Sequence, residues 1–183
     1  SNPGVALDPA TGLVSVAPGT PAGTYTITYK ICEKLNPANC ATSSVTVVVD
    51  AAPSAAGADS LAPVNGKAGG NDVIDVFAND TLNGAPVTLS SISASVTAPA
   101  TPINGGPVPV LDPATGLVDV PAGTPAGSYT IAYEICETLN PSNCASSSVT
   151  IVVTAAPIAA GADTPASVNG ASGNPSVTNA FAN

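Results

Sequence analysis

The sequence repeats itself at an offset of 104 residues without a single gap. Of the 79 overlapping positions, 51 are identical; Cys32 aligns with Cys136, and Cys40 with Cys144. Divergent domains rarely keep such identity without an insertion or deletion, so the pattern indicates a recent tandem duplication. The period is too long for a solenoid repeat of about 20–50 residues. It is the size of one autonomous domain.

The repeat divides the chain into three parts. Residues 51–154 form one complete unit, residues 1–50 the C-terminal part of one repeat, and residues 155–183 the N-terminal part of the next. A unit of 104 residues is close to an immunoglobulin-like (Ig-like) sandwich of about 100. The two partial units together lack the counterpart of Asp80–Asn104. We therefore expect the parent chain to continue in both directions, with strand donation between neighbouring molecules as the alternative.

Apolar and polar side chains alternate over several short segments, as expected of β-strands with one buried face. Residues 24–32 and 40–49 form the clearest pair, joined by a loop with an Asn-Pro turn signal. Pairing them with Cys32 opposite Cys40 puts the apolar side chains of both strands on one face, whereas a one-residue slip would invert it. Further strands are expected at Val5–Leu7, Leu13–Val16, Val73–Phe77 and Pro86–Val96. Since Pro and Gly recur too often for helices, we predict an all-β fold of tandem Ig-like antiparallel β-sandwich repeats.

The side chains that the chain lacks restrict its chemistry. It has no His, Met, Trp, Arg or Gln, and three lysines are its only basic residues. Without His, a Ser–His–Asp triad, a Cys–His dyad or an imidazole-based zinc site is impossible within the chain, so we expect neither an enzyme nor a cofactor. The formal net charge of −9 disfavours nucleic acid and anionic membrane surfaces as partners. No apolar run reaches the roughly 18 residues of a membrane-spanning helix.

The four cysteines lie in one Cys-x7-Cys pair per repeat. Thiolate metal sites usually use closer pairs in groups of four, whereas the predicted strand register sets the two cysteines of each pair opposite one another. We therefore expect the disulfides Cys32–Cys40 and Cys136–Cys144, each within its own repeat. Disulfides persist in oxidising surroundings, so this pattern predicts a location outside the cytosol.

A group of carboxylates is the other candidate for chemistry. Its members are Asp59, Asp72, Asp75 and Asp80. Calcium takes oxygen ligands and favours such clusters, but Asp and Asn near Gly or Thr also commonly cap turns. Only the first of these residues recurs as Asp in the next repeat, at Asp163; Ser176 and Asn179 align with the second and third. We therefore expect turn capping, and keep structural calcium as the alternative.

Several segments also match the pattern of a known family. They are Gly23–Glu33, Asn36–Cys40, Ser44–Val49, Asp75–Gly84 and Leu111–Gly116. Across essentially its whole length, the chain resembles the bacterial Ig-like and cadherin-like surface repeats of fibrillar adhesins and other giant secreted proteins. The resemblance implies an extracellular or cell-surface location, tandem neighbours as partners and no catalytic residues. Many such relatives use calcium between domains.

Two classes of function follow. The first is a structural module of a long extracellular fibre, which needs only to fold and extend, and near-identical units favour it. The second is an adhesion module whose loops bind a surface glycan or a protein. A binding site should distinguish one unit by exposed aromatic side chains, and neither copy has them. The tyrosines alternate with isoleucine, which favours core packing over sugar stacking; they are Tyr25, Tyr29, Tyr129 and Tyr133.

Overall fold

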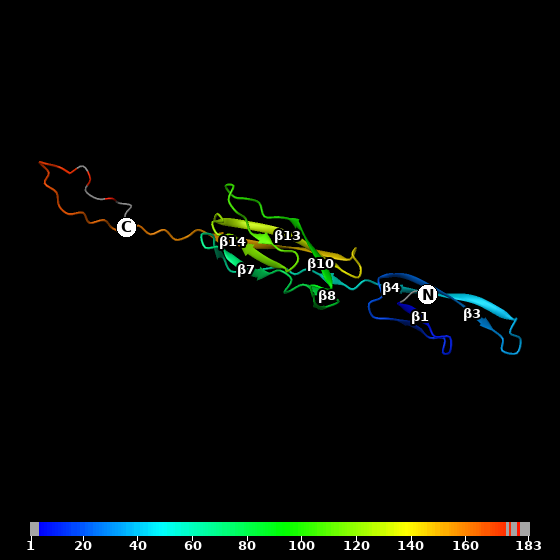
Figure 1. Cartoon of the computed structure of the whole chain (residues 1–183). Helices are drawn as coiled ribbons and strands as arrows, with labels where there is room; N and C mark the ends of the chain where they lie inside the picture. Colours follow the sequence, from blue (N-terminus) through cyan, green and yellow to red (C-terminus); the bar gives the residue numbers. More distant parts are fainter. Residues whose placement is uncertain (1–3, 175, 177–178, 180–183) are drawn as a thin grey trace.

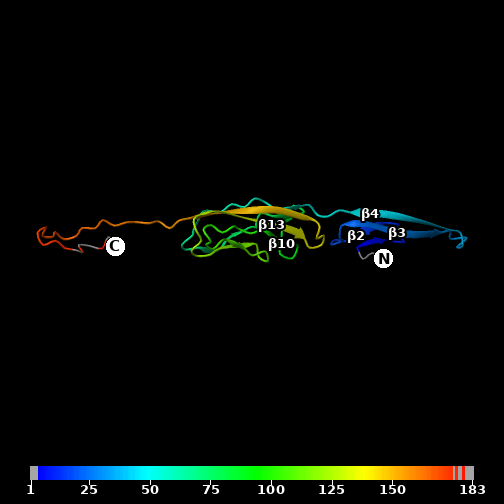
Figure 2. The same cartoon turned by 90° about the horizontal axis from the view of Figure 1, so that it is seen from above.

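The computed structural model describes residues 4–174, 176 and 179, and every element in this part of the chain is a β-strand. The strands form two groups that follow one another along one axis (Figure 1, Figure 2). The first group contains β1 (Val5–Leu7), β2 (Val14–Val16), β3 (Gly23–Cys32) and β4 (Cys40–Val49). The second contains β5 (Ser54–Ala55), β6 (Val64–Asn65), β7 (Gly70–Asp75), β8 (Thr81–Leu82), β9 (Ala85–Pro86), β10 (Ile92–Ala98), β11 (Val110–Leu111), β12 (Leu117–Val120), β13 (Gly127–Glu137) and β14 (Cys144–Thr154).

The second group is an Ig-like β-sandwich. One sheet has the strand order β10-β13-β14-β6, and the facing sheet the order β11-β12-β7. A small third sheet has the order β5-β8-β9. Every second side chain of β13 and β14 points between the sheets, so Tyr129, Ile131 and Tyr133 are at most 1% exposed. They pack with Val118 and Val120 of the opposite sheet in one core. The alternation seen in the sequence thus produces a two-layer core.

One strand pair in this sandwich is parallel. β6 pairs with the end of β14, with Val64 opposite Val153, and Asp59 forms a further parallel bridge with Val149. The segment that leads into the sandwich therefore runs beside its last strand and in the same direction. The sequence indicated antiparallel pairing throughout, because a two-residue parallel contact leaves no periodic signal.

The first group contains the same core strands with less cover. β1 pairs with β2, and β3 with β4, as two separate two-stranded sheets. Ile31 is 63% exposed, whereas its counterpart Ile135 in the second group is 1% exposed. Among the described residues, no strand of the first group occupies the place of β10, which pairs with β13 in the second group.

The predicted register of the long hairpin is confirmed. Cys32 lies opposite Cys40, and on the other, apolar face Ile27 lies opposite Val45. The prediction of one strand over Pro86–Val96 was wrong, because β9 ends at Pro86 and β10 begins at Ile92. Between them the chain turns: the Ser91 backbone N–H donates to the carbonyl of Thr88 (2.9 Å), and the Thr88 N–H to the Ser91 hydroxyl (3.0 Å). Serine side chains commonly stabilise such turns against an extended strand.

Candidate functional site

A disulfide closes the same end of each long hairpin. The structure joins Cys32 to Cys40 and Cys136 to Cys144, with Cα–Cα distances of 4.1 and 4.0 Å. Each bridge spans directly opposed residues of adjacent strands and closes a loop of seven residues. Such a bridge restrains the hairpin end and leaves the sandwich core unconnected, which differs from the inter-sheet bridge of antibody domains.

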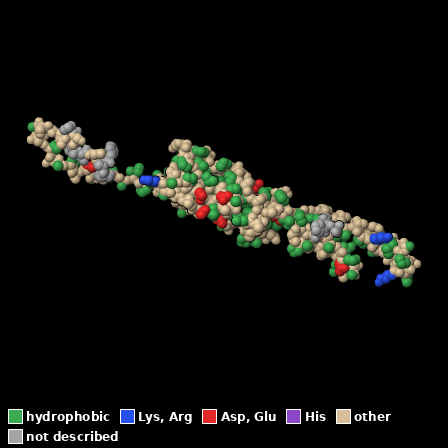
Figure 3. Space-filling view, viewed as in Figure 1, with side chains coloured by type: hydrophobic (Ala, Val, Ile, Leu, Met, Phe, Trp, Pro, Cys, Tyr) green, Lys and Arg blue, Asp and Glu red, His purple; other side chains and the backbone are tan. Residues whose placement is uncertain are grey.

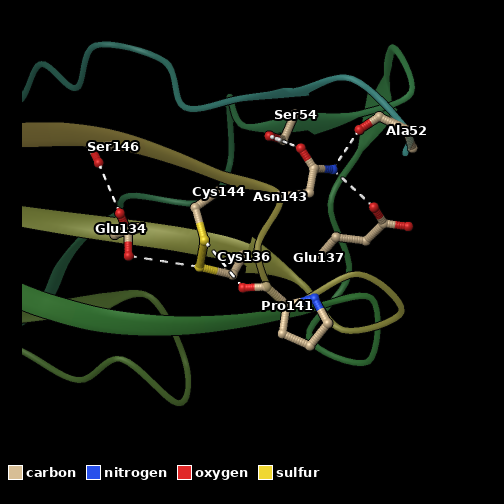
Figure 4. The surroundings of a disulfide bond; sticks show 9 residues. All are labelled: Ala52, Ser54, Glu134, Cys136, Glu137, Pro141, Asn143, Cys144 and Ser146. Atoms are coloured by element: carbon tan, nitrogen blue, oxygen red, sulfur yellow. Dashed lines mark hydrogen bonds between the residues drawn. A yellow bond between two sulfur atoms is a disulfide. The ribbon is translucent and has the colours of Figure 1, made fainter. Parts of the chain in front are cut away.

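In the second group, the loop that the disulfide closes holds the connection between the two groups by hydrogen bonds (Figure 4). The Asn143 side-chain amide donates to the carbonyl of Ala52 (2.6 Å) and to the Glu137 carboxylate (2.8 Å). The Ser54 hydroxyl donates to the side-chain oxygen of Asn143 (3.4 Å). Glu137 is 5% exposed, so its carboxylate needs hydrogen-bond donors in the protein, and the Asn143 amide is one of them. The loop therefore fixes the path by which the chain enters the sandwich.

The same loop also contacts the first group directly. The Ala22 backbone N–H donates to the side-chain oxygen of Asn140 (2.6 Å), 118 residues further along the chain. Asn140 is 9% exposed. Because Ala22 lies just before β3, the hairpin tip of one unit rests on the base of the unit before it. The two side views, turned by 90° from one another, agree with this end-to-end arrangement (Figure 1, Figure 2).

The corresponding loop of the first group has the same glutamate and asparagine residues, and it is exposed to solvent. The Asn36 and Asn39 amides donate to the Glu33 carboxylate (2.6 and 3.0 Å) and lower the pKa of Glu33, with Asn39 contributing most. Asn36 is exposed, whereas its counterpart Asn140 is buried. Ala126, the counterpart of Ala22, is exposed at the far end of the second group. We call the contact of Asn140 and Asn143 with Ala22 and Ala52 the joint. The counterparts of its two asparagines and of Ala22 are exposed at the two ends of the described array.

Two aspartates meet the Tyr133 hydroxyl beside the core. This hydroxyl lies 3.0 Å from the Asp59 carboxylate, 3.0 Å from the Val76 carbonyl and 3.5 Å from both oxygens of Asp80. Burial raises the pKa of Asp59 to about 6, and the charges of Asp80 and Asp75 add to the rise. Burial also raises the pKa of Asp80, although the Gly57 backbone N–H donates to its carboxylate (2.7 Å). Protonation of these carboxyl groups therefore stabilises the folded sandwich.

The structure brings two of the four candidate calcium ligands together, since Asp59 and Asp80 share the Tyr133 hydroxyl. The other two candidates are Asp72 and Asp75. Asp75 accepts the Phe77 backbone N–H (2.9 Å), as a turn cap does. Asp72 is exposed, with a φ of 49°. Within residues 4–174, no three of the four carboxylates bring ligand oxygens within 4.8 Å of one another. Calcium takes about six to eight oxygens, more than these two carboxylates supply, and calcium binding here stays a prediction to be tested.

Three other side chains among the described residues do bring possible ligand atoms within 4.8 Å of one another, namely Glu134, Cys136 and Cys144. Both sulfurs belong to the disulfide and offer no thiolate, which is the form that binds metal. In the space-filling view, acidic side chains gather over the second group, and basic side chains lie at the outer end of the first (Figure 3). Among the described residues, no helix is long and apolar enough to cross a membrane.

The comparisons with known proteins concern the fold. No protein-family model matches the chain, and no curated protein matches its sequence significantly. Among solved structures, the crystal structure of mouse cadherin-23 EC22-24 is similar, with 17% sequence identity and a TM-score of 0.41. The match covers 83% of this chain and half the length of that cadherin chain.

The residues of the joint were not found from the sequence. The Asn36-Pro37 step indicated a turn and nothing more, although the pattern Glu-x2-Asn-Pro-x-Asn recurs intact at 137–143. The polar residues that recur in both loops were the available signal, because loops that only connect strands are free to vary.

Proposed function

We propose that this chain is a structural repeat module of a long extracellular bacterial fibre or fibrillar adhesin, without catalytic activity. In this proposal residues 51–154 are one complete Ig-like repeat, residues 1–50 end a preceding repeat, and residues 155–183 begin a following one. The fibre extends or links cells by adding units in line. Adjacent repeats are the partners that it needs.

The joint between the groups is the observation that supports this proposal. Asn140 accepts a hydrogen bond from Ala22, and Asn143 holds Ala52 in the connection. Together they restrain both the base of one unit and the path into the next. Interfaces between adjacent domains of a chain otherwise permit relative motion by default. The repeat of this joint every 104 residues would give a straight, semi-rigid array.

The disulfides fit the location that the proposal requires. An array of β-strand units with one disulfide in each and few charged residues suits an oxidising, extracellular setting. Surface residues that recur in both copies suit contacts between units better than recognition of one foreign ligand. A glycan- or protein-binding adhesion module stays the alternative function.

Electron microscopy of material from the native source tests the proposal. We expect filaments whose axial period matches the spacing of the two groups, and peptides of this sequence throughout them. Denaturing, reducing mass measurement then shows how the units are joined: a species far above 17.5 kDa means covalent continuation. Isolated globular particles without filaments would contradict the fibre role.

A further inference from the structure

The two disulfides have the same local backbone geometry. We call Cys32–Cys40 the first bridge and Cys136–Cys144 the second bridge. In each hairpin the glutamate after the first cysteine donates its backbone N–H to the carbonyl of the last loop asparagine, at 2.9 Å in both. The sulfur of the second cysteine lies 3.2 Å from a proline carbonyl in the first hairpin and 3.5 Å from one in the second. The backbone therefore gives the two bridges matched surroundings.

The side chains around the bridges differ in charge. From two residues before the first cysteine to the second cysteine, the two copies differ at three of eleven positions, and two of these differences change the charge. Glu134 stands where the first group has Lys30, and Thr138 where it has Lys34. The glutamate after the first cysteine is common to both copies. The end of the first hairpin thus has two lysines and one glutamate, and the end of the second has two glutamates and no basic residue.

The carboxylate of Glu134 lies against the second bridge (Figure 4). One of its oxygens is 3.7 Å from the sulfur of Cys136, and a carboxylate oxygen lies within 4.8 Å of both sulfurs. The Ser146 hydroxyl donates to the other oxygen (3.3 Å) and holds the carboxylate in this position. A negative charge is therefore held beside the second bridge, whichever of its sulfurs is attacked.

Lys30 occupies the same place on the strand beside the first bridge. It precedes the first cysteine of β3 by two residues, as Glu134 does on β13. Side chains two residues apart on a strand share one face of the sheet. Lys30 pairs with Thr42, just as Glu134 pairs with Ser146, and Lys30 is exposed. The first bridge therefore has a cation on its face of the sheet where the second bridge has an anion.

Charge beside a disulfide affects how fast it opens, because the attacking and the leaving groups are both thiolates. A lysine attracts the incoming thiolate and stabilises the sulfur that leaves, whereas a carboxylate opposes both. One unit charge about 4 Å from another changes an equilibrium about fivefold in water. Since the charges beside the two bridges have opposite signs, we expect opening rates that differ by about tenfold after screening by water and salt.

We propose that the first bridge is a site of thiol–disulfide exchange with low-molecular-weight dithiols, which the second bridge resists. A thiolate of the dithiol attacks one sulfur of the first bridge, forms a mixed disulfide with it and expels the other sulfur as a thiolate. The second thiol of the dithiol then displaces the remaining cysteine. The dithiol is oxidised by two electrons, the bridge is reduced by the same two, and both protons of the dithiol end on the cysteines.

This inference goes beyond the fibre role and does not depend on it. Opening the first bridge removes the covalent closure of the loop at 33–39. The second bridge stays closed under the same conditions, because Glu134 repels the reductant. One side chain at one strand position thus decides whether the hairpin end of a unit responds to reduction.

Initial rates of reduction in the full 183-residue chain test the proposal. Timed alkylation and peptide mapping after addition of dithiothreitol, at neutral pH and low ionic strength, give a rate for each bridge. We expect the first bridge to open about tenfold faster than the second. Equal rates, or faster opening of the second bridge, would overturn the proposal.

Charge-reversal variants compare each bridge with itself, so differences between the flanking strands do not enter. K30E should slow opening of the first bridge by about tenfold, and E134K should speed opening of the second by a similar factor. K30Q and E134Q are the matched neutral variants and should give intermediate rates, with circular dichroism as the check that each variant is folded. An unchanged rate in either reversal, or a change of the opposite sign, would refute the assignment.

Salt gives an independent measurement on the unmodified chain. The ratio of the two rates should fall severalfold between about 0.01 M and about 1 M salt, since the Debye length falls from about 30 Å to about 3 Å. A ratio that salt does not change would mean that access, rather than charge, sets the rates, and the proposal would then be wrong.

Discussion

The substitution Asp59→Asn should remove a pH dependence that the structure builds into the sandwich. Asp59 lies half-buried with the Tyr133 hydroxyl 3.0 Å away and the carboxylate of Asp80 nearby. An asparagine keeps an oxygen that accepts the hydrogen bond from the tyrosine, and it has no charge. The substitution therefore isolates the electrostatic cost of Asp59 from the packing of its side chain.

The raised pKa fixes the sign of the effect. The pKa of Asp59 rises from 3.8 to about 6 on folding, so the folded state binds a proton that the unfolded chain has already released. The stability from this proton is fully present below about pH 3.8 and is lost as the pH rises through about 6. The shift is worth about 3 kcal/mol if unscreened. Since Asp59 is half-buried and water screens it, we expect about 1 kcal/mol.

Urea unfolding at fixed ionic strength, at steps between pH 4 and pH 7.5, measures this directly. The free energy of unfolding of the unsubstituted chain should fall by about 1 kcal/mol over this range, and D59N should flatten most of the fall. D163N is the matched control, because Asp163 is the exposed counterpart in the next repeat. A stability that stays level or rises with pH, or an equal decline in D59N, would refute the reasoning.

Three further predictions concern the disulfides, calcium and the joint. Non-reducing peptide mapping should find Cys32–Cys40 and Cys136–Cys144 alone, and reduction should cost about 2–3 kcal/mol per closed loop in the chain-entropy model; free thiols or a bridge between repeats would contradict this. Adding chelator should shift the melting temperature by a few degrees at most, because no three of the candidate carboxylates lie within 4.8 Å of one another. A larger fall would mean that an ion is bound, since an ion at a hundredfold excess over its Kd adds about 2.7 kcal/mol to the free energy of unfolding. N140A should leave the sandwich folded by circular dichroism but broaden the distribution of inter-unit angles in small-angle scattering, and an unchanged distribution would mean that the joint does not depend on this hydrogen bond.

The register of the long hairpins could be predicted because two independent patterns agree on it. Alternating apolar side chains in 24–32 and 40–49 require one face, and the opposed cysteines require the same pairing. Where only one weak pattern was present, the prediction was less accurate. Residues 86–96 alternate enough to suggest one strand, but the Thr88–Ser91 turn uses side-chain hydroxyls in a way that alternation does not reveal.

Contacts between distant segments could not be read from the sequence at all. Asp59 lies 74 residues from Tyr133, and Ala22 lies 118 residues from Asn140. Nothing local marks such pairs, because each residue alone is an ordinary turn or surface residue. The repeat supplied the one usable signal: Asp59 recurs as Asp163, and Asn140 matches Asn36.

The parallel pairing of β6 with β14 has a mechanical consequence. The chain enters the complete unit shortly before β6 and leaves it after Thr154, so tension along the array pulls these two strands in opposite directions along their length. Their hydrogen bonds are then loaded in shear and must yield together, unlike the bonds of a hairpin peeled open from its end. The disulfide at Cys136 and Cys144 lies outside this contact, at the other end of β14. Resistance to pulling therefore depends on a short non-covalent clamp, while the covalent bridge only keeps its own seven-residue loop from extending after the clamp fails.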